Sequence, residues 1–272
     1  WDDALEALGE LEKIYGDLQQ YPLEDIMFRN KNTPESIFEV QRTYTAGGLA
    51  VTTNVAAICT PSHNGKGIYD GVEIPEMGTG MATWTSMRPN SYFCDGLQTK
   101  KGNDKRKTLN MAWEYDGKPF SNVGTRPWLG PKFWCPGMQN TADFNNQKIF
   151  RYADAVLMLS ECDAEQENID ESIRYLNMVK ERAGLAPYTF KNIESLMEEI
   201  QKERGRELLG EFQRKFDLVR WGIWYQMTYE YTNYPTLKDN MLPCHEYYPI
   251  PDKEVVYSGG ALDNKAYNEY GM

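Results

Sequence analysis

A series of amphipathic segments after residue 147 constrains this chain more than any other feature. Ile169, Ile173, Leu176 and Val179 recur at helical spacing on one face, and residues 192–209 repeat that pattern. Residues 148–164 are dense in apolar side chains, which is typical of a largely buried helix. Short connections between such helices predict antiparallel pairs of the tetratricopeptide type, although no clean sequence period of about 34 residues is present.

Capping residues and breakers mark where the expected helices begin and end. Asn192 is a suitable N-cap, and Gly184 followed by Pro187 predicts the end of the preceding helix. A further helix is expected near 212–227. The first twenty residues also show helical spacing, ended by Tyr21-Pro22, and SIFEVQ (36–41) alternates like a strand.

The segment from 45 to 146 has no such periodicity. Gly, Pro, Asn, Ser and Thr recur there in GGLA, SHNGKG, EMGTG and MRPNS. Four of the seven tryptophans lie in it, at Trp84, Trp113, Trp128 and Trp134. Long irregular stretches inside a folded domain tend to carry function, so a binding region is predicted here.

Charge and composition exclude several classes of protein. The formal net charge of −11 argues against nucleic-acid binding and against an anionic membrane surface. No stretch of about 20 apolar residues is present. The five cysteines form no CxxC pair, and His63 and His245 are far apart, so neither a metal site nor a cofactor is expected. The lysine run from Lys100 to Lys107 is interpreted as a solvated loop.

Residues 203–221, ERGRELLGEFQRKFDLVRW, combine many charges with few apolar residues. Two carboxylates, Glu203 and Glu207, share a helix face and could be a glycosidase acid and base. Every carboxylate in this stretch, however, has an arginine within one turn, which lowers the pKa of a carboxyl group, whereas a general acid needs a raised pKa. The sequence therefore favours a structural Arg-Glu network, predicted to include Arg151, Asp154, Glu203, Arg204, Glu207, Arg214, Asp217 and Arg220.

Motifs in the same order along most of the chain resemble those of the SusD/RagB family of outer-membrane nutrient-binding lipoproteins. The stretch just quoted is similar to the family pattern ER..EL..EG.R..DL.R. The other motifs are RYAD at 151–154, the Asn177–Gly184 segment, YPIP at 248–251, SIFEVQ, and Arg88-Pro89 with Asp104-Lys105-Arg106. The sequence departs from the family pattern at three positions. Phe212 stands where the family has a glycine, Lys215 stands where it has an aromatic residue, and Cys162 lies in SEC where the family has AEA.

The resemblance implies a mainly α, SusD-like fold on a tetratricopeptide-type helix-pair scaffold with few short strands. Family members are about twice this length and carry a lipidated N-terminal cysteine, so 1–272 is expected to be the C-terminal part of a single SusD-like domain. Within it, 45–146 would be the binding region, 147–230 the helical scaffold and 231–272 a C-terminal loop segment.

The resemblance also implies a function. Family members are not enzymes: they bind oligosaccharides or similar nutrients at the surface of the Gram-negative outer membrane. They deliver them to a SusC-like TonB-dependent transporter. A membrane contact would come only through the lipid anchor, which this chain lacks, and no nucleic acid or cofactor is involved.

Aromatic side chains in the loop-rich region are the candidate sugar contacts, because Trp and Tyr offer rigid faces with a polar tip. Trp84 is the first candidate, with Arg88, Asn90 and Tyr92 near it in sequence. Tyr69, expected on a glycine-rich loop, is the second. Trp113 completes the predicted set, although its alternating context favours core packing; Trp128 and Trp134 are expected to pack against the helices, and Trp221 and Trp224 to belong to the scaffold.

Two other functions remain open from the residues alone. A helical-repeat glycoside hydrolase could use loop carboxylates such as Asp70 or Glu73. A helical-repeat surface protein could instead bind a peptide or protein through the same loops.

Overall fold

The structure is a computed structural model that describes residues 1–45, 47–60, 68–69, 72–73, 87–115, 118–119, 127–138 and 141–271. These residues form two compact units, Trp1–Phe212 and Gln213–Met272, and each is described by itself. The fold is mainly helical with few short strands, as the sequence predicts. In the part of the chain that is described, no helix is both long enough and apolar enough to cross a membrane.

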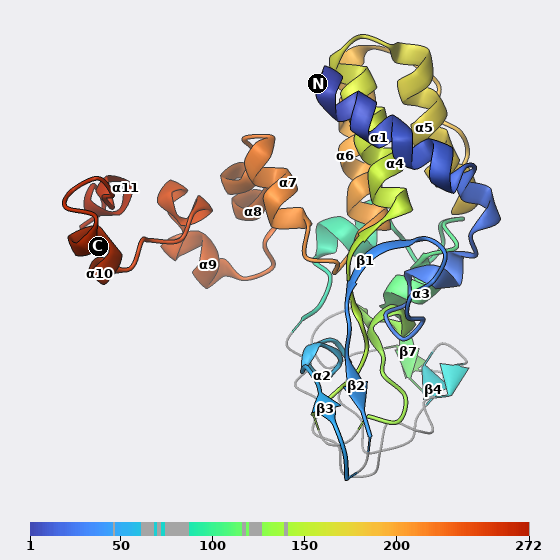
Figure 1. The fold of residues 1–272 in the computed structure, drawn as a ribbon, viewed down its shortest axis with the longest axis horizontal. Coiled ribbons are helices and arrows are strands. Elements are labelled where there is room, and N and C mark those ends of the chain that lie inside the picture. Colours follow the sequence, from blue (N-terminus) through green and yellow to red (C-terminus); the bar gives the residue numbers. More distant parts are fainter. Residues whose placement is uncertain are drawn as a thin grey trace. The chain divides into compact units, whose positions relative to one another are not determined.

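Four longer helices of the first unit pack side by side around one apolar core (Figure 1). They are α1 (Asp2–Tyr15), α4 (Tyr152–Glu165), α5 (Ile169–Arg182) and α6 (Ile193–Glu207). α4 is buried along almost its whole length, because apolar residues surround it on every side. α5 and α6 contribute one stripe each, including Leu176, Val179, Leu196 and Ile200. The predicted helix pairs are therefore present.

The ends of these helices follow the expected capping rules. The side chain of Asn192 accepts a hydrogen bond from the Ser195 amide at 2.8 Å, as an N-cap does. Gly184 has a φ of 74°, and its amide and that of Leu185 bond back into the last turn of α5. α1 ends at Tyr15, earlier than Tyr21-Pro22 predicts, because Gly16 adopts a φ of 67°.

A two-stranded antiparallel ribbon joins the helical layer to the rest of the first unit. It pairs β1 (Ser36–Val40) with β10 (Gln147–Arg151), and Phe38 lies opposite Phe150. The prediction that residues 148–151 belong to a helix is wrong. Their partner strand lies more than a hundred residues earlier, so the local apolar pattern could not reveal the pairing.

The segment 45–146 contains only short elements in its described parts. The helical elements are the α-helices α2 (Val55–Cys59) and α3 (Lys107–Asn110), the π-helix η3 (Tyr92–Leu97) and the 3₁₀ helix η4 (Pro131–Phe133). The strands are β3 (Ala50–Val51), β4 (Ile68–Tyr69), β5 (Val72–Glu73), β6 (Met111–Ala112), β7 (Glu114–Tyr115), β8 (Lys118–Pro119) and β9 (Trp128–Leu129). β2 (Thr43–Tyr44) pairs with β3, β6 pairs with β9, and the order β5-β4-β7-β8 forms a small sheet.

Tryptophans anchor the core of this loop-rich segment. Trp134 is fully buried and Trp128 nearly so, packed with Ala56 and Ala57 of α2. The indole nitrogen of Trp134 donates to the Leu129 carbonyl at 3.2 Å. Large aromatic rings with a satisfied polar atom stabilise a region that has little regular structure.

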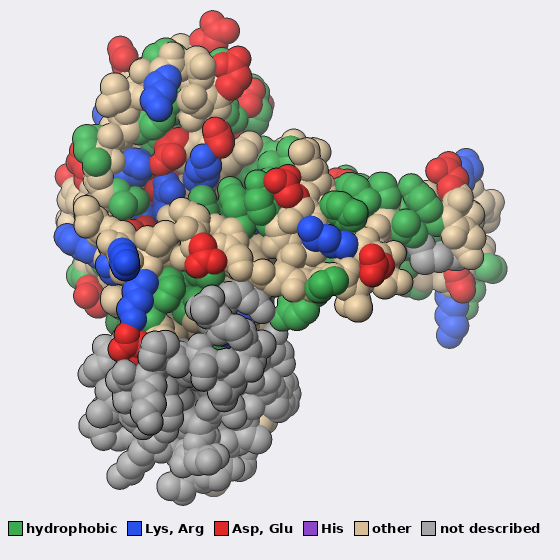
Figure 2. Space-filling model, turned by 180° about the vertical axis from the view of Figure 1, so that it is seen from behind, with side chains coloured by type: hydrophobic (Ala, Val, Ile, Leu, Met, Phe, Trp, Pro, Cys, Tyr) green, Lys and Arg blue, Asp and Glu red, His purple; other side chains and the backbone are tan. Residues whose placement is uncertain are grey.

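Two 3₁₀ turns, η1 (Leu18–Gln20) and η2 (Leu23–Ile26), follow α1 in the first unit. The second unit contains α7 (Arg214–Arg220), α8 (Trp224–Tyr231), α9 (Pro235–Asn240), η5 (Pro243–Glu246), α10 (Asp252–Tyr257) and α11 (Lys265–Asn268). The prediction of one helix over 212–227 is wrong, because Gly222 takes a φ of 69° and separates α7 from α8. Hydrophobic side chains lie on the surface of this unit (Figure 2). Phe216, Tyr248 and Tyr257 are among its exposed residues.

Candidate functional site

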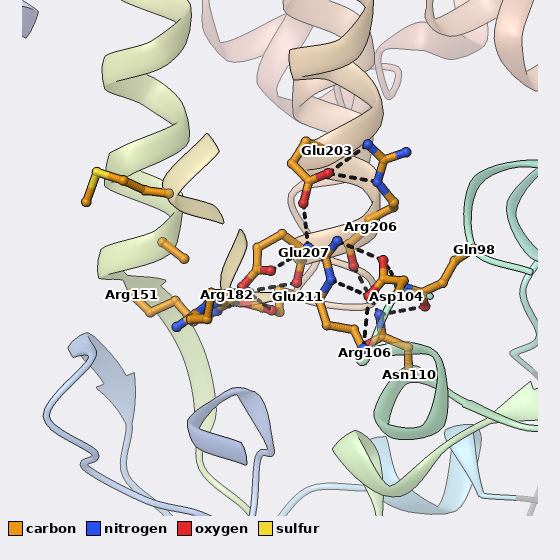
Figure 3. Close-up of polar contacts among 12 residues, drawn as sticks. Gln98, Asp104, Arg106, Asn110, Arg151, Arg182, Glu203, Arg206, Glu207 and Glu211 are labelled. Atoms are coloured by element: carbon orange, nitrogen blue, oxygen red, sulfur yellow. Dashed lines mark hydrogen bonds and ion pairs between the residues drawn. The ribbon is translucent and has the colours of Figure 1, made fainter. Parts of the chain in front are cut away.

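Charged side chains from distant parts of the sequence meet in the interior of the first unit (Figure 3). Five cations and five carboxylates balance one another, and all ten residues are buried. This ion-pair network consists of Arg106, Lys132, Arg151, Arg182 and Arg206 with Glu35, Asp104, Glu203, Glu207 and Glu211.

Glu207, in the last turn of α6, is the centre of the network. Its Oε1 accepts hydrogen bonds from Arg151 Nη1 at 2.5 Å and from Arg182 Nη2 at 2.6 Å, and its Oε2 accepts one from Arg106 Nη1 at 2.6 Å. The three arginines come from β10, from α5 and from the turn before α3. One carboxylate therefore joins the helical layer, the ribbon and the loop-rich segment.

Arg151 is held on every side. Its Nε and Nη2 donate to the two carboxylate oxygens of Glu211, both at 2.9 Å, and its Nη1 also donates to Glu35 at 2.8 Å. Lys132, fully buried in η4, donates to Glu211 at 2.6 Å. Bidentate arginine–carboxylate pairs are among the stronger and more directional contacts in proteins.

Arg106 forms a second fork at the other side of Glu207. Its Nε and Nη2 donate to Asp104 at 2.9 and 2.8 Å, and its Nη1 lies 2.7 Å from a carboxylate oxygen of Glu203. Arg206 extends the chain by donating to Glu203 at 2.8 Å and to Glu199 at 2.6 Å.

The electrostatics of the network disfavour acid catalysis. Burial opposes the ionisation of Glu207, but Arg151, Arg182 and Arg106 outweigh it and hold the pKa of that carboxyl group well below its usual range. Glu35 also has a lowered pKa, because the two arginines it contacts offset its burial. A general acid needs a carboxyl group that stays protonated near neutral pH. These two carboxylates are instead fixed in the charged form, which suits a structural cross-link.

The other predicted network residues lie in separate pairs. Arg204 and Asp154 form a buried ion pair at 2.9 Å between α6 and α4, in which burial raises the pKa of Asp154 although Arg204 opposes it. In the second unit, Arg220 contacts Asp217 at 3.0 Å. Arg214 lies over the ring of Trp221, with 5.7 Å between guanidinium and ring centroid. The sequence did not single out Glu35 or Lys132, because their partners lie far away along the chain.

Two of the predicted sugar contacts cannot be followed to their side chains. Trp84 lies outside the described residues. Tyr69 lies in β4, so the expectation that it occupies a loop is wrong. Its Cα partner in the antiparallel β7 is Tyr115, a residue that the sequence analysis did not select. Strand pairing in this small sheet places the two tyrosine positions opposite each other, and no local sequence pattern predicted that pairing.

Arg88 and Asn90, which precede η3 in the chain, are partly buried. The Arg88 guanidinium lies 4.2 Å from the centroid of the Trp128 ring, and its Nε donates to the Pro127 carbonyl at 3.3 Å. The side chain of Asn90 accepts from the Phe93 amide at 3.0 Å. These bonds orient both side chains within the loop-rich segment.

Tyr92 and Trp113 are partly buried. Trp113 packs against the cluster of Phe93, Cys94 and Met111, and its indole nitrogen donates to the Lys107 carbonyl at 3.3 Å. The structure thus places Trp113 on this small core, whereas Tyr92 is shown only as the first residue of η3, and it adds Trp128 as the aromatic partner of Arg88. All five cysteines are buried, and none of them is in a disulfide.

Comparison with known proteins gives one consistent result. The model of the SusD family matches residues 132–267, which is half of the chain. The SusD-like protein P25 of Formosa agariphila is 33% identical over 175 residues, covering 61% of this chain and 32% of that protein. A SusD superfamily protein of Bacteroides vulgatus is 26% identical, with a TM-score of 0.62 over 93% of this chain and 57% of that one.

A solved structure of lower identity shares the fold. Surface glycan-binding protein A of Bacteroides thetaiotaomicron, solved in complex with laminarihexaose, is 19% identical with a TM-score of 0.66 and covers 96% of this chain and 59% of that one. The chain therefore spans about a third of the curated relative and just under three fifths of these two solved structures. Because the SusD family model matches half of this chain, the chain belongs to the SusD family.

Proposed function

We propose that this protein captures an oligosaccharide at the bacterial cell surface and passes it to a SusC-like TonB-dependent transporter in the outer membrane. The match of the SusD family to half of the chain carries this proposal. The fold shared with a surface glycan-binding protein that holds laminarihexaose supports the ligand class. In this proposal the protein is a lipid-anchored surface protein of a Gram-negative bacterium and does not turn over its ligand.

In this proposal the helices and the loop-rich segment of the first unit have different roles. The ion-pair network fixes the helices to the ribbon and to the turns around α3 and η4. The loop-rich segment 45–146 then presents the sugar contacts, with Trp84 as the main stacking residue and Tyr69, Arg88, Asn90, Tyr92 and Trp113 as its companions. Residues 147–230 act as scaffold, 231–272 as a C-terminal segment, and all belong to one SusD-like domain.

Calorimetric titration with a panel of neutral oligosaccharides, laminarihexaose included, tests the proposal. We expect saturable binding of one glycan class and at least a tenfold weaker affinity in Trp84→Ala, because an aromatic face carries much of the contact energy in such sites. Trp1→Ala is the matched control, since Trp1 is an exposed tryptophan in the N-terminal segment. That variant should bind like the parent protein.

Product analysis of the same mixtures separates the alternatives. New reducing ends would support a glycoside hydrolase that uses Asp70 or Glu73 and would contradict the capture role. If no oligosaccharide of the panel gave binding heat and a peptide bound saturably, the results would support a peptide-binding surface protein instead.

A further inference from the structure

Asp143 connects two parts of the loop-rich segment that are far apart in sequence. Its backbone pairs with that of Thr53: the Thr53 amide donates to the Asp143 carbonyl at 2.9 Å, and the Asp143 amide donates to the Thr53 carbonyl at 2.8 Å. Its side chain accepts the amide N–H of Ala56, in the first turn of α2, at 2.8 Å. This one residue therefore fastens residues 141–146 to the start of α2.

The helix α2 is too short to hold itself in place. It contains five residues, and isolated helices shorter than about 12 residues are marginal in water. Its N-cap residue, Asn54, makes no side-chain hydrogen bond to the helix and donates instead to the Thr141 hydroxyl at 3.2 Å. Asp143 therefore supplies the side-chain acceptor for an N–H group at the start of this helix.

The carboxyl group of Asp143 is buried without a counter-ion. The residue has no exposed surface, and among the described residues its carboxyl oxygens have two hydrogen-bond partners, the amides of Ala56 and Asn145. Lys31 and Arg42 lie near it, but the Lys31 Nζ and the Arg42 Nη1 donate to backbone carbonyl groups instead. Removing a carboxylate from water costs free energy unless a cation pairs with it, so burial favours the neutral form.

The groups around this carboxyl group do not change charge in the pH range where Asp143 does. Burial raises the pKa of the Cys59 thiol in α2 to about 12 and that of the Cys135 thiol after η4 to about 11, so both stay neutral. Lysine and arginine side chains, such as Lys31 and Arg42, are ordinarily charged at neutral pH and below. Burial raises the pKa of Asp143 from 3.8 to about 6, so this carboxyl group titrates between pH 5 and 7.

The far end of α2 is bonded to the segment that carries Arg88. The Met87 amide donates to the Ile58 carbonyl at 3.2 Å. Arg88 follows directly, and its guanidinium lies 4.2 Å from the centroid of the Trp128 ring. Trp128 in turn packs in one apolar cluster with Ala56. The helix therefore supports this segment twice, through a backbone hydrogen bond and through the cluster that holds Trp128.

We propose that Asp143 is a pH-dependent latch on α2: its neutral carboxyl group holds α2 closed on residues 141–146, and loss of the proton to water favours a local opening that hydrates the carboxylate. The closed state binds the proton more tightly than the open state, so the latch is most stable in acid and weakens as the pH rises through about 6. The latch needs no ligand and does not depend on the proposed function. It would make the order of the segment that carries Arg88 depend on pH.

Amide hydrogen exchange of the intact chain, followed by nuclear magnetic resonance, tests this latch. The carboxyl group ionises near pH 3.8 when exposed and near pH 6 when closed, so the opening equilibrium should rise about tenfold between pH 5 and 7. The protection factors of the Ala56 and Met87 amides should fall by that factor. The Ser195 amide, which the Asn192 side chain holds at the exposed start of α6, should show no such step.

Three variants assign the step to its group. Asp143→Asn keeps an acceptor for the Ala56 amide but cannot ionise, so the step should vanish. Asp163→Asn is the matched control: Asp163 is also buried with a raised pKa, but it lies in α4, so the step should remain. His63 lies outside the described residues and is the histidine nearest to α2 in sequence. His63→Gln should also leave the step in place.

The parent protein provides a second measurement that does not require Asp143→Asn to fold. The carboxyl carbon signal of Asp143 should titrate with a midpoint near pH 6, in parallel with the loss of Ala56 protection. Constant Ala56 protection between pH 5 and 7, a midpoint near pH 4 as in an ordinary aspartate, or a step that survives in Asp143→Asn would each overturn the latch. A step at Ala56 without one at Met87 would overturn its link to the segment that carries Arg88.

Discussion

Two buried carboxylates of the first unit, Glu207 in the ion-pair network and Asp143 in the loop-rich segment, are held in different ways. Glu207 contacts three guanidinium groups at 2.5–2.6 Å, which keep its pKa well below the usual range despite burial. Asp143 accepts the amide N–H of Ala56 at 2.8 Å and of Asn145 at 3.2 Å. Burial dominates there and raises the pKa of Asp143 to about 6.

The difference shows how one chain can combine a fixed helical scaffold with an irregular, loop-rich segment. Close ion pairs cross-link the helices to the ribbon. The loop-rich segment relies more on backbone hydrogen bonds and on buried tryptophans. Irregular segments of folded domains are generally supported by a rigid scaffold, and the ion-pair network provides such a support here.

The largest expected effect comes from breaking the network. Arg151→Met removes the cation that Glu35, Glu207 and Glu211 share and leaves buried carboxylates without their main partner. Loss of one partner from a buried ion pair costs about 3–5 kcal/mol. We expect a decrease of that size in the free energy of unfolding, measured by urea denaturation at pH 7.

Lys13→Met is the control for that experiment. Lys13 pairs with Glu10 at 2.5 Å, but both side chains are more than half exposed. Exposed pairs contribute about 0–1 kcal/mol, so this variant should unfold at nearly the parental urea concentration. A loss below about 1 kcal/mol in Arg151→Met would show that the network does not hold the first unit together.

The second prediction concerns pH and distinguishes the two carboxylates directly. The pKa of Asp143 rises from 3.8 to about 6 on folding, so its contribution to stability is complete below about pH 4 and is lost as the pH rises through 6. At about 1.4 kcal/mol per pKa unit, the parent protein should lose about 2–3 kcal/mol relative to Asp143→Asn between pH 4 and 7.

Glu207 should show the opposite sign. Its pKa is lowered on folding, so its contribution is present above about pH 4.5 and is lost as the pH falls. The destabilisation caused by Arg151→Met should therefore shrink in acid, as followed by urea denaturation between pH 3 and 7. If both variants showed the same pH trend, the contrast between the two regions would be mistaken.

The third prediction tests packing within the loop-rich segment. A Cβ on Gly130 would lie 2.7 Å from the Leu109 carbonyl oxygen and from the Met111 nitrogen. Because these are backbone atoms, Gly130→Ala should cost about 1–3 kcal/mol in the free energy of unfolding. Gly96→Ala is the matched control, since nothing lies within 4 Å of its added Cβ. An unaffected Gly130→Ala would mean that β6 and β9 can separate freely.

The same contrast explains what the sequence could predict. Helices α5 and α6, the Asn192 cap and the Gly184 terminus depend on neighbours within a few residues, so periodicity and capping rules identified them. The strand at 147–151 and the network residue Glu35 depend on partners about a hundred residues away. Local patterns carry no information about such contacts.

The candidate site was less predictable for the same reason. Sequence context selected Arg88 for its closeness to Trp84, but its observed aromatic partner is Trp128, forty residues later. Tyr69 was selected as a loop residue, whereas strand pairing places it opposite Tyr115. Arg182 was visible only as part of a family motif, because the carboxylates it binds, Glu35 and Glu207, lie in two other segments of the chain.

The smallest expected effect is a gain in stability, from Gly9→Ala in α1. Gly9 lies in the middle of this helix, has no heavy atom within 4 Å of an added Cβ, and therefore contributes only backbone entropy to the unfolded chain. Alanine should raise the free energy of unfolding by about 0.5–1 kcal/mol in the same urea experiment. Gly130→Ala and Gly9→Ala are the same chemical change with opposite expected signs, because one added methyl group meets backbone and the other meets open space. A loss of stability in Gly9→Ala would show that α1 packs more tightly on α4 than its Leu5, Leu8 and Leu11 contacts indicate.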